Sequence, residues 1–164
     1  MKTIMSPTKT TTTIKKQELP PNPFVHEVLE LVSKQRSRAK KVELLQEYES
    51  DALKALFIWN FDDTVISMVP EGQVPYKENE VPVGTDHTSL RREWKHLYNF
   101  VKGGNDSLSS LRRETMFIQI LEGLHPEEAK ILCLVKDKAL QSKYKITYEM
   151  VAQAYPDIQW GGRS

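Results

Sequence analysis

The sequence predicts an all-α fold of about seven helices in a compact bundle, with a long Pro-containing crossover loop and an extended N-terminal arm. Three observations favour this fold class. Apolar residues recur at spacings of three and four through most of the chain after Pro23. Ser, Thr or Asp, which cap helices well, stand directly before several of these stretches. One segment rich in Pro and Gly, residues 62–88, interrupts the pattern.

The first 22 residues differ from the rest of the chain. They are rich in Thr, Lys and Pro and have few apolar side chains to bury. We therefore expect residues 1–22 to form a flexible or extended arm, and residues 23–164 to form a single helical domain. Two interpretations of the arm stay open, a disordered tail and a segment that lies on a partner or on phosphates.

Three helices are expected in the first part of the domain. The first covers about residues 24–33, the second begins after Ser37, and the third begins at Ser50 and Asp51. Asp62 and Asp63 are adjacent, and adjacent residues on a helix do not face each other, so they are not expected to form a catalytic pair. We expect them to end the third helix near Phe61 instead. Short connections predict antiparallel neighbours.

Residues 62–88 are expected to form an irregular crossover, because three prolines and two glycines prevent a long helix or a regular strand. Loops of this length are usually functional or held down by apolar residues. Four apolar residues are the expected anchors of this loop: Val69, Val74, Tyr76 and Val81.

Four helices are expected after the crossover. One follows the apolar stripe of residues 90–101 and ends at Gly103-Gly104. The next, around residues 111–121, is apolar on most sides, so we expect it to be central and buried. Pro126 suits the first position of a third helix, and Thr147 can cap a last helix over residues 147–155, with Met150, Val151 and Ala154 facing the core.

Charge and composition limit the classes of function. The formal net charge is +1, but residues 1–22 carry four lysines and one glutamate, which leaves 19 basic and 21 acidic residues in the domain. A dedicated nucleic-acid binder usually has a larger basic excess, unless its basic groups gather on one face. No apolar run approaches the ~20 residues of a membrane span, so no membrane association is expected. The single cysteine, Cys133, lies in an apolar helical stretch and is predicted to be a core thiol.

Known catalytic and metal-binding motifs are not found in the sequence. The stretch "HEVLE" at 26–30 resembles the beginning of a zinc-protease helix, but the second His is replaced by Glu30. The other histidines have no metal-ligand spacing, and no Gly-rich phosphate loop or G-x-S-x-G motif occurs. We therefore predict a protein without catalytic activity, cofactor, metal or small-molecule substrate.

Basic residues form several local clusters, such as "SKQRSRAKK" at 33–41. A solvated helix face explains each cluster taken singly. Together, the loops between helices can bring them to one side, where Lys and Arg neutralise phosphates and release counterions. The candidate phosphate-binding residues are Lys40, Lys41, Arg112, Arg113, Lys136, Lys138, Lys143 and Lys145.

The order of these features resembles the N-terminal helical DNA-binding domain of phage-type ATP-dependent DNA ligases. The likeness rests on "HEVLELVSKQRSRAKKVELLQEYESDALKALF", "MVPEGQVPY", "EEAKILCLVKDKAL" and "ITYEMVAQAYPDI". The chain is also similar to small stand-alone proteins of contractile-tailed bacteriophages, through "FIQILEGLHPEEAKIL", "VKDKAL" and "VAQAYPDI". The resemblance implies a module that binds the phosphate backbone of duplex DNA. By the same resemblance, the residues in this role are Lys136, Lys138, Lys143 and Lys145. No K-x-D-G nucleotidylation motif is present, so the ligase reaction is not implied.

Two hypotheses of function follow. The first is a non-enzymatic phage accessory protein that binds duplex DNA without reading its sequence, in replication, repair or transcription, in the cytoplasm of an infected bacterium. The second is a virion or assembly component, in which the arm docks the domain onto phage replication, transcription or virion proteins.

Overall fold

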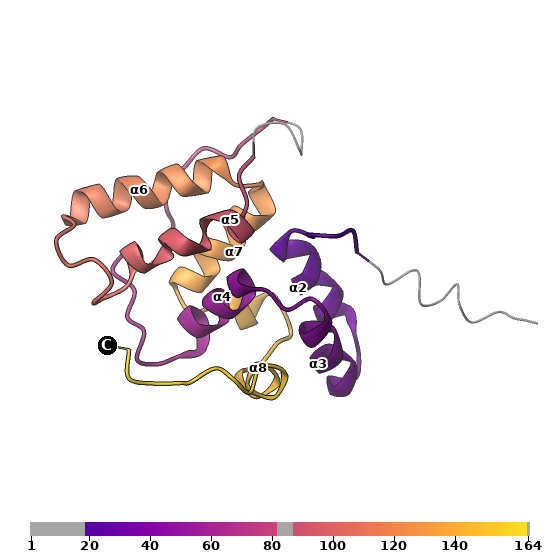
Figure 1. Ribbon diagram of the computed structural model, residues 1–164. Helices are drawn as coiled ribbons and strands as arrows, with labels where there is room; N and C mark the ends of the chain where they lie inside the picture. Colours follow the sequence, from indigo (N-terminus) through magenta and orange to yellow (C-terminus); the bar gives the residue numbers. More distant parts are fainter. Residues whose placement is uncertain (1–18, 82–86, 164) are drawn as a thin grey trace, which may run out of the picture.

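The computed structural model describes residues 19–81 and 87–163, and within these ranges the protein is all-α, as predicted. Figure 1 shows α2 (Val25–Lys34) and α3 (Arg38–Glu47) on one side, with α4 (Asp51–Phe61) and α7 (Pro126–Lys136) in the centre. On the opposite side lie α5 (Leu90–Glu93), which continues as the 3₁₀ helix η2 (Trp94–Phe100), and α6 (Ser110–Gly123). A short 3₁₀ turn, η3 (Leu140–Ser142), leads to α8 (Tyr148–Ala154), which packs against α3. In the described residues no helix is long and apolar enough to cross a membrane. Most of the predicted arm, residues 1–18, lies outside the described residues.

The caps predicted at Ser37, Ser50 and Thr147 are confirmed, and Ser109 caps a fourth helix. The side chains of Ser37, Ser50, Ser109 and Thr147 each accept a hydrogen bond from a backbone N–H in the first turn of the following helix. Pro126 occupies a first-turn position of α7, as expected. These bonds satisfy N–H groups that have no partner inside the helix, and they fix where each helix begins.

The core is built from α2, α3, α4, α7 and α8. Leu29, Leu45, Phe57 and Leu132 are fully buried in it. Tyr155 is buried as well, and its hydroxyl donates a hydrogen bond of 2.6 Å to the carbonyl of Leu45. Val151 and Ala154 face this core as predicted, whereas Met150 is only half-buried. The last helix therefore completes the bundle.

The helix predicted over residues 90–101 is only partly an α-helix. The stripe from Leu90 to Val101 begins as an α-helix, but from Trp94 it is a 3₁₀ helix, in which Leu97 and Phe100 are buried three residues apart. That spacing matches the three residues per turn of a 3₁₀ helix. Gly104 follows, and a Cβ there would lie 1.8 Å from the carbonyl oxygen of Tyr98, so only glycine fits.

The prediction that α6 is central and buried is wrong. Of its apolar residues only Phe117 and Leu121 are buried, and Leu111 is 77% exposed. The helix packs against α7 and η2 along one face, at the edge of the molecule (Figure 1). Its other apolar side chains are partly covered, because one narrow contact face does not enclose a helix.

The described part of the crossover, residues 62–81 and 87–88, contains no helix. Isolated bridges pair Ser67 with Val101 and Thr88 with Leu124. Val69 is buried, and Val74 and Tyr76 pack against the core, as predicted. Val81 is 38% exposed, so its predicted role as an anchor is wrong.

Candidate nucleic-acid interface

The predicted basic loop before α8 is largely committed to internal contacts. Lys136 is 2% exposed, and its ammonium donates hydrogen bonds to the carbonyls of Pro70 and Gly72, at 2.9 Å each, and to the Asp137 carboxylate at 2.6 Å. The prediction that Lys136 is presented to a ligand is therefore wrong. A cation with three such acceptors holds the crossover against the end of α7.

Lys138 also points inward. It adopts a left-handed backbone conformation, with φ of 56°, and its ammonium donates to the carbonyls of Trp59 at 2.6 Å and Asp62 at 2.8 Å. Burial lowers the pKa of Lys138. These bonds satisfy carbonyls at the end of α4, where helices leave such groups without partners.

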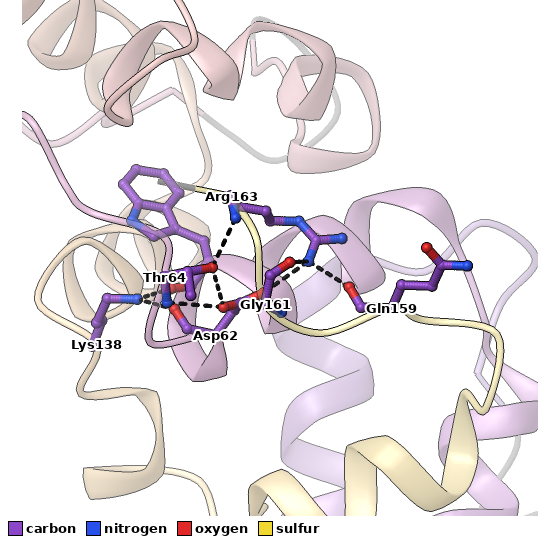
Figure 2. Close-up of polar contacts among 7 residues, drawn as sticks. Asp62, Thr64, Lys138, Gln159, Gly161 and Arg163 are labelled. Atoms are coloured by element: carbon purple, nitrogen blue, oxygen red, sulfur yellow. Dashed lines mark hydrogen bonds and ion pairs between the residues drawn. The ribbon is translucent and has the colours of Figure 1, made fainter.

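Beside Lys138, the carboxylate of Asp62 holds the end of the chain (Figure 2). It accepts hydrogen bonds from the N–H and hydroxyl of Thr64, from the N–H of Gly161 at 2.8 Å, and from the Arg163 guanidinium at 2.7 Å. Burial alone would raise the pKa of Asp62, but these donors lower it to about 2. Asp62 therefore ends α4, as predicted, and also anchors the C-terminal segment, a role the sequence does not indicate.

Lys41 and Arg113 are buried too, so their predicted exposure is wrong. The Lys41 ammonium donates to the carbonyl of Lys145 at 2.6 Å, and burial followed by the charge of Lys145 lowers the pKa of Lys41. The Arg113 guanidinium donates to the carbonyls of Asn99, Asn105 and Leu108 and ties the loop before α6 to η2. Both side chains satisfy loop carbonyls.

The remaining predicted cations lie at the surface. Lys40 pairs with Glu43 at 2.8 Å, and Lys143 lies 3.4 Å from Glu127. Arg112 and Lys145 are exposed and form no ion pair within the described ranges. The eight predicted residues therefore do not form one surface.

A different group of cations does come together. Lys34, Arg36 and Arg38 lie on the turn between α2 and α3, and all are exposed. The backbone N–H of Lys145 donates to the Ser33 hydroxyl at 3.2 Å, which places Lys145 beside this turn. We name Lys34, Arg36, Arg38 and Lys145 the α2–α3 basic surface. None of the four side chains has an acidic partner among the residues that the structure describes.

The basic run "SKQRSRAKK" indicates this turn, but the two lysines predicted from it to bind phosphate do not belong to the surface. Lys40 is paired with Glu43, and Lys41 is buried. The helical periodicity of the sequence distinguishes the buried Lys41 from its exposed neighbours. Lys41 lies one position before Val42 and four before Leu45, on the face that packs inward.

The thiol of Cys133 is poorly suited to act as a nucleophile. Burial raises the pKa of the Cys133 thiol to about 11, so the nucleophilic thiolate is scarce at neutral pH. Across residues 19–81 and 87–163, no group of three or more His, Cys, Asp and Glu side chains could hold a metal ion.

A family model described as a family of unknown function, DUF6433, matches residues 28–142 of the chain. The match covers most of the chain, and the protein belongs to this family. No curated protein and no solved structure matches it.

Proposed function

We propose that the protein binds duplex DNA through phosphate contacts, without reading sequence and without catalysis, as an accessory protein of phage replication, repair or transcription in an infected bacterium. The observation that carries the proposal is the α2–α3 basic surface, where four exposed cations lie together without acidic partners. Because uncompensated Lys and Arg side chains release counterions from DNA, such a surface supplies a sequence-independent affinity. The resemblance to the ligase DNA-binding module is consistent with this role.

The proposal changes the residues expected to contact DNA. Four of the predicted cations donate their hydrogen bonds to carbonyl or carboxylate oxygens of the protein itself: Lys41, Arg113, Lys136 and Lys138. Lys34, Arg36, Arg38 and Lys145 are the main candidates, with Lys40 and Lys143 at the margin because each has an acidic neighbour. Phosphate contacts position a protein on DNA and carry no sequence information.

Binding of the purified protein to a short fluorescent duplex, intact and nicked, across a salt series tests the proposal. The Arg36/Arg38/Lys145→Ala variant removes three charges from the α2–α3 basic surface. If each contacts one phosphate, the slope of log affinity against log salt becomes shallower by about 3. The matched control, Lys77/Arg92/Lys95→Ala, removes three exposed charges elsewhere and should leave the slope unchanged. Equal effects of both variants, or no binding at low salt, would refute the proposal.

A second function has one observation in its favour. Two exposed apolar side chains, Ile66 at 42% and Met68 at 41%, line a groove on another part of the surface. Contiguous apolar surface often marks a protein contact. This observation favours the alternative of a virion or assembly component. The Arg36/Arg38/Lys145→Ala variant should not affect a protein contact at this groove.

A further inference from the structure

A groove of about 650 Å³ lies between the segment that follows α4 and the beginning of α6. Residues 65–71 form one wall, and the end of α7 forms the floor. Ile66, Met68, Ser110 and Glu114 line it, and Leu111, at 77% exposure, follows Ser110 at the edge. The groove is separate from the α2–α3 basic surface, since no residue of that surface lines it.

One wall of the groove is an extended segment with an open edge. Met68 donates its backbone N–H to the carbonyl of Phe100 at 2.7 Å, and Ile66 accepts from the N–H of Lys102 at 2.8 Å. In this antiparallel arrangement the backbone groups of Ser67 point the other way. The backbone N–H groups of Ser67 and Val69 have no partner among the described residues. Such an edge is a template for one more strand.

The groove is acidic. Asp63, Glu71 and Glu114 line it and form no ion pair within the described part of the chain. Lys136 pairs with Asp137, and Lys138, which donates to uncharged backbone carbonyls, offsets one of these three charges. The four acids and two lysines of the lining therefore leave a net charge of −2. The groove therefore suits an extended, basic segment with apolar side chains.

We propose that this groove binds residues 8–16, "TKTTTTIKK", of a second copy of the chain as an added strand. This segment has three lysines and no acidic residue, so its charge complements the groove. Five Thr and one Ile favour an extended backbone, and neither Pro nor Gly interrupts it. Its backbone donors and acceptors would pair with the open edge at Ser67 and Val69.

The source is a second copy because residues 8–16 end only three positions before Leu19, which lies away from the groove (Figure 1). Leu19 is held beside α3 by a hydrogen bond of 3.1 Å from its N–H to the Tyr48 hydroxyl. At ~3.6 Å per residue, Lys16 stays within about 11 Å of Leu19. In Figure 1 the indigo segment before α2 and the purple segment after α4 lie on opposite sides of the molecule. Each copy thus offers a segment at one end and a groove at the other, which produces a head-to-tail assembly.

Sedimentation of the full chain over a concentration series tests the proposal. The wild type should self-associate, and both the Lys9/Lys15/Lys16→Glu and the Glu71/Glu114→Lys variants should sediment as monomers. A mixture of the two variants should associate again, because the exchanged charges are complementary. The control, Glu78/Glu80→Lys, changes two exposed acids outside the groove and should behave as the wild type.

A fluorescent peptide of residues 8–16 gives an independent readout. It should bind the full chain about tenfold more weakly after Glu71/Glu114→Lys. The same peptide with alternate backbone nitrogens methylated keeps its charge but loses strand donors, and it should not bind. A wild type that stays monomeric, a mixture that does not associate, or a methylated peptide that binds equally well would each overturn the proposal.

Discussion

Asp62 illustrates how a single side chain organises several segments. Its two carboxylate oxygens receive four hydrogen bonds, from Thr64 in the crossover and from Gly161 and Arg163 at the end of the chain (Figure 2). The carboxylate is buried, so its charge is stabilised by these donors and not by water. Removing that charge should loosen the crossover and the C-terminal segment together.

We predict that Asp62→Asn lowers the free energy of unfolding at pH 7 by about 2 kcal/mol, as follows from a pKa lowered from 3.8 to about 2. A carboxyl whose pKa is lowered by folding contributes stability above pH 3.8 and loses it as the pH falls from 3.8 towards 2. Urea denaturation should therefore show the same deficit at pH 7 and pH 5 and a smaller one at pH 3. Asp63→Asn, at an exposed neighbour without an ion pair in the described ranges, is the control and should be near neutral. A deficit that stays constant down to pH 3 would contradict this account.

At the scale of elements, three helices begin at one buried carboxylate. Glu128 in α7 accepts the backbone N–H of Val25 in α2 at 2.7 Å and that of Leu90 in α5 at 2.9 Å. In the first turn of α2, the ring of His26 stacks on that of His125, the N-cap of α7, with centroids 4.5 Å apart. His125 caps α7 by accepting the N–H of Glu127 at Nδ1. The junction therefore joins the first turns of α2, α5 and α7.

This junction should make stability depend on pH. Burial, followed by the neighbouring His125, lowers the pKa of His26 from 6.5, against the opposing charges of Glu30, Glu27 and Glu127. The unfolded chain then binds more protons just below pH 6.5, so stability falls as the pH drops from 6.5 towards the lower folded pKa. His26→Phe should flatten this fall in urea midpoints measured from pH 8 to pH 5.

Glu128 acts in the opposite direction, because burial raises its pKa and its protonation in the folded state adds stability as the pH falls. The comparison of wild type with His26→Phe isolates the histidine, since Glu128 is common to both. Parallel pH profiles for the two proteins would show that His26 does not titrate on unfolding in this range.

The elements also show what the sequence could and could not predict. Helix starts were predictable, because a Ser or Thr cap is a local signal, and Ser37, Ser50 and Thr147 form the expected bonds. The environment of α6 was not, since Leu111 and Phe117 are equally apolar in sequence and only packing leaves one exposed and the other buried. The burial of Lys136 could not be predicted for the same reason, because its partners Pro70 and Gly72 are more than 60 positions away in the chain. The α2–α3 turn was visible as a basic run, but the position of Lys145 beside it depends on a tertiary contact.

For the whole molecule, the arrangement separates two surfaces. The α2–α3 basic surface and the acidic groove at residues 63–71 have opposite charge, and no residue is common to both. A nearly neutral chain can therefore present a local positive field to phosphates and a local negative one to a basic peptide. The net charge of +1 hides both features.

The bundle also depends on its last helix, although the family match ends at residue 142. Beyond that point the chain contributes five buried apolar side chains: Tyr144, Ile146, Val151, Ala154 and Tyr155. Each large one contributes roughly 1.5–3 kcal/mol, so their sum is comparable with the 5–15 kcal/mol that stabilises a typical domain. Their loss would also expose the faces of α3 and α4 that they cover.

We therefore predict that a chain ending at Ser142 does not unfold cooperatively. Thermal melts followed by circular dichroism should lack the sigmoidal transition of the full chain, and its amide proton spectrum should be poorly dispersed. Adding a peptide of residues 143–163 should restore a transition, because Tyr155 could again donate to Leu45 and cover Phe57. A truncated chain that melts with the midpoint of the full chain would contradict this prediction. It would show that residues up to 142 fold stably without α8, and that α8 does not stabilise the core.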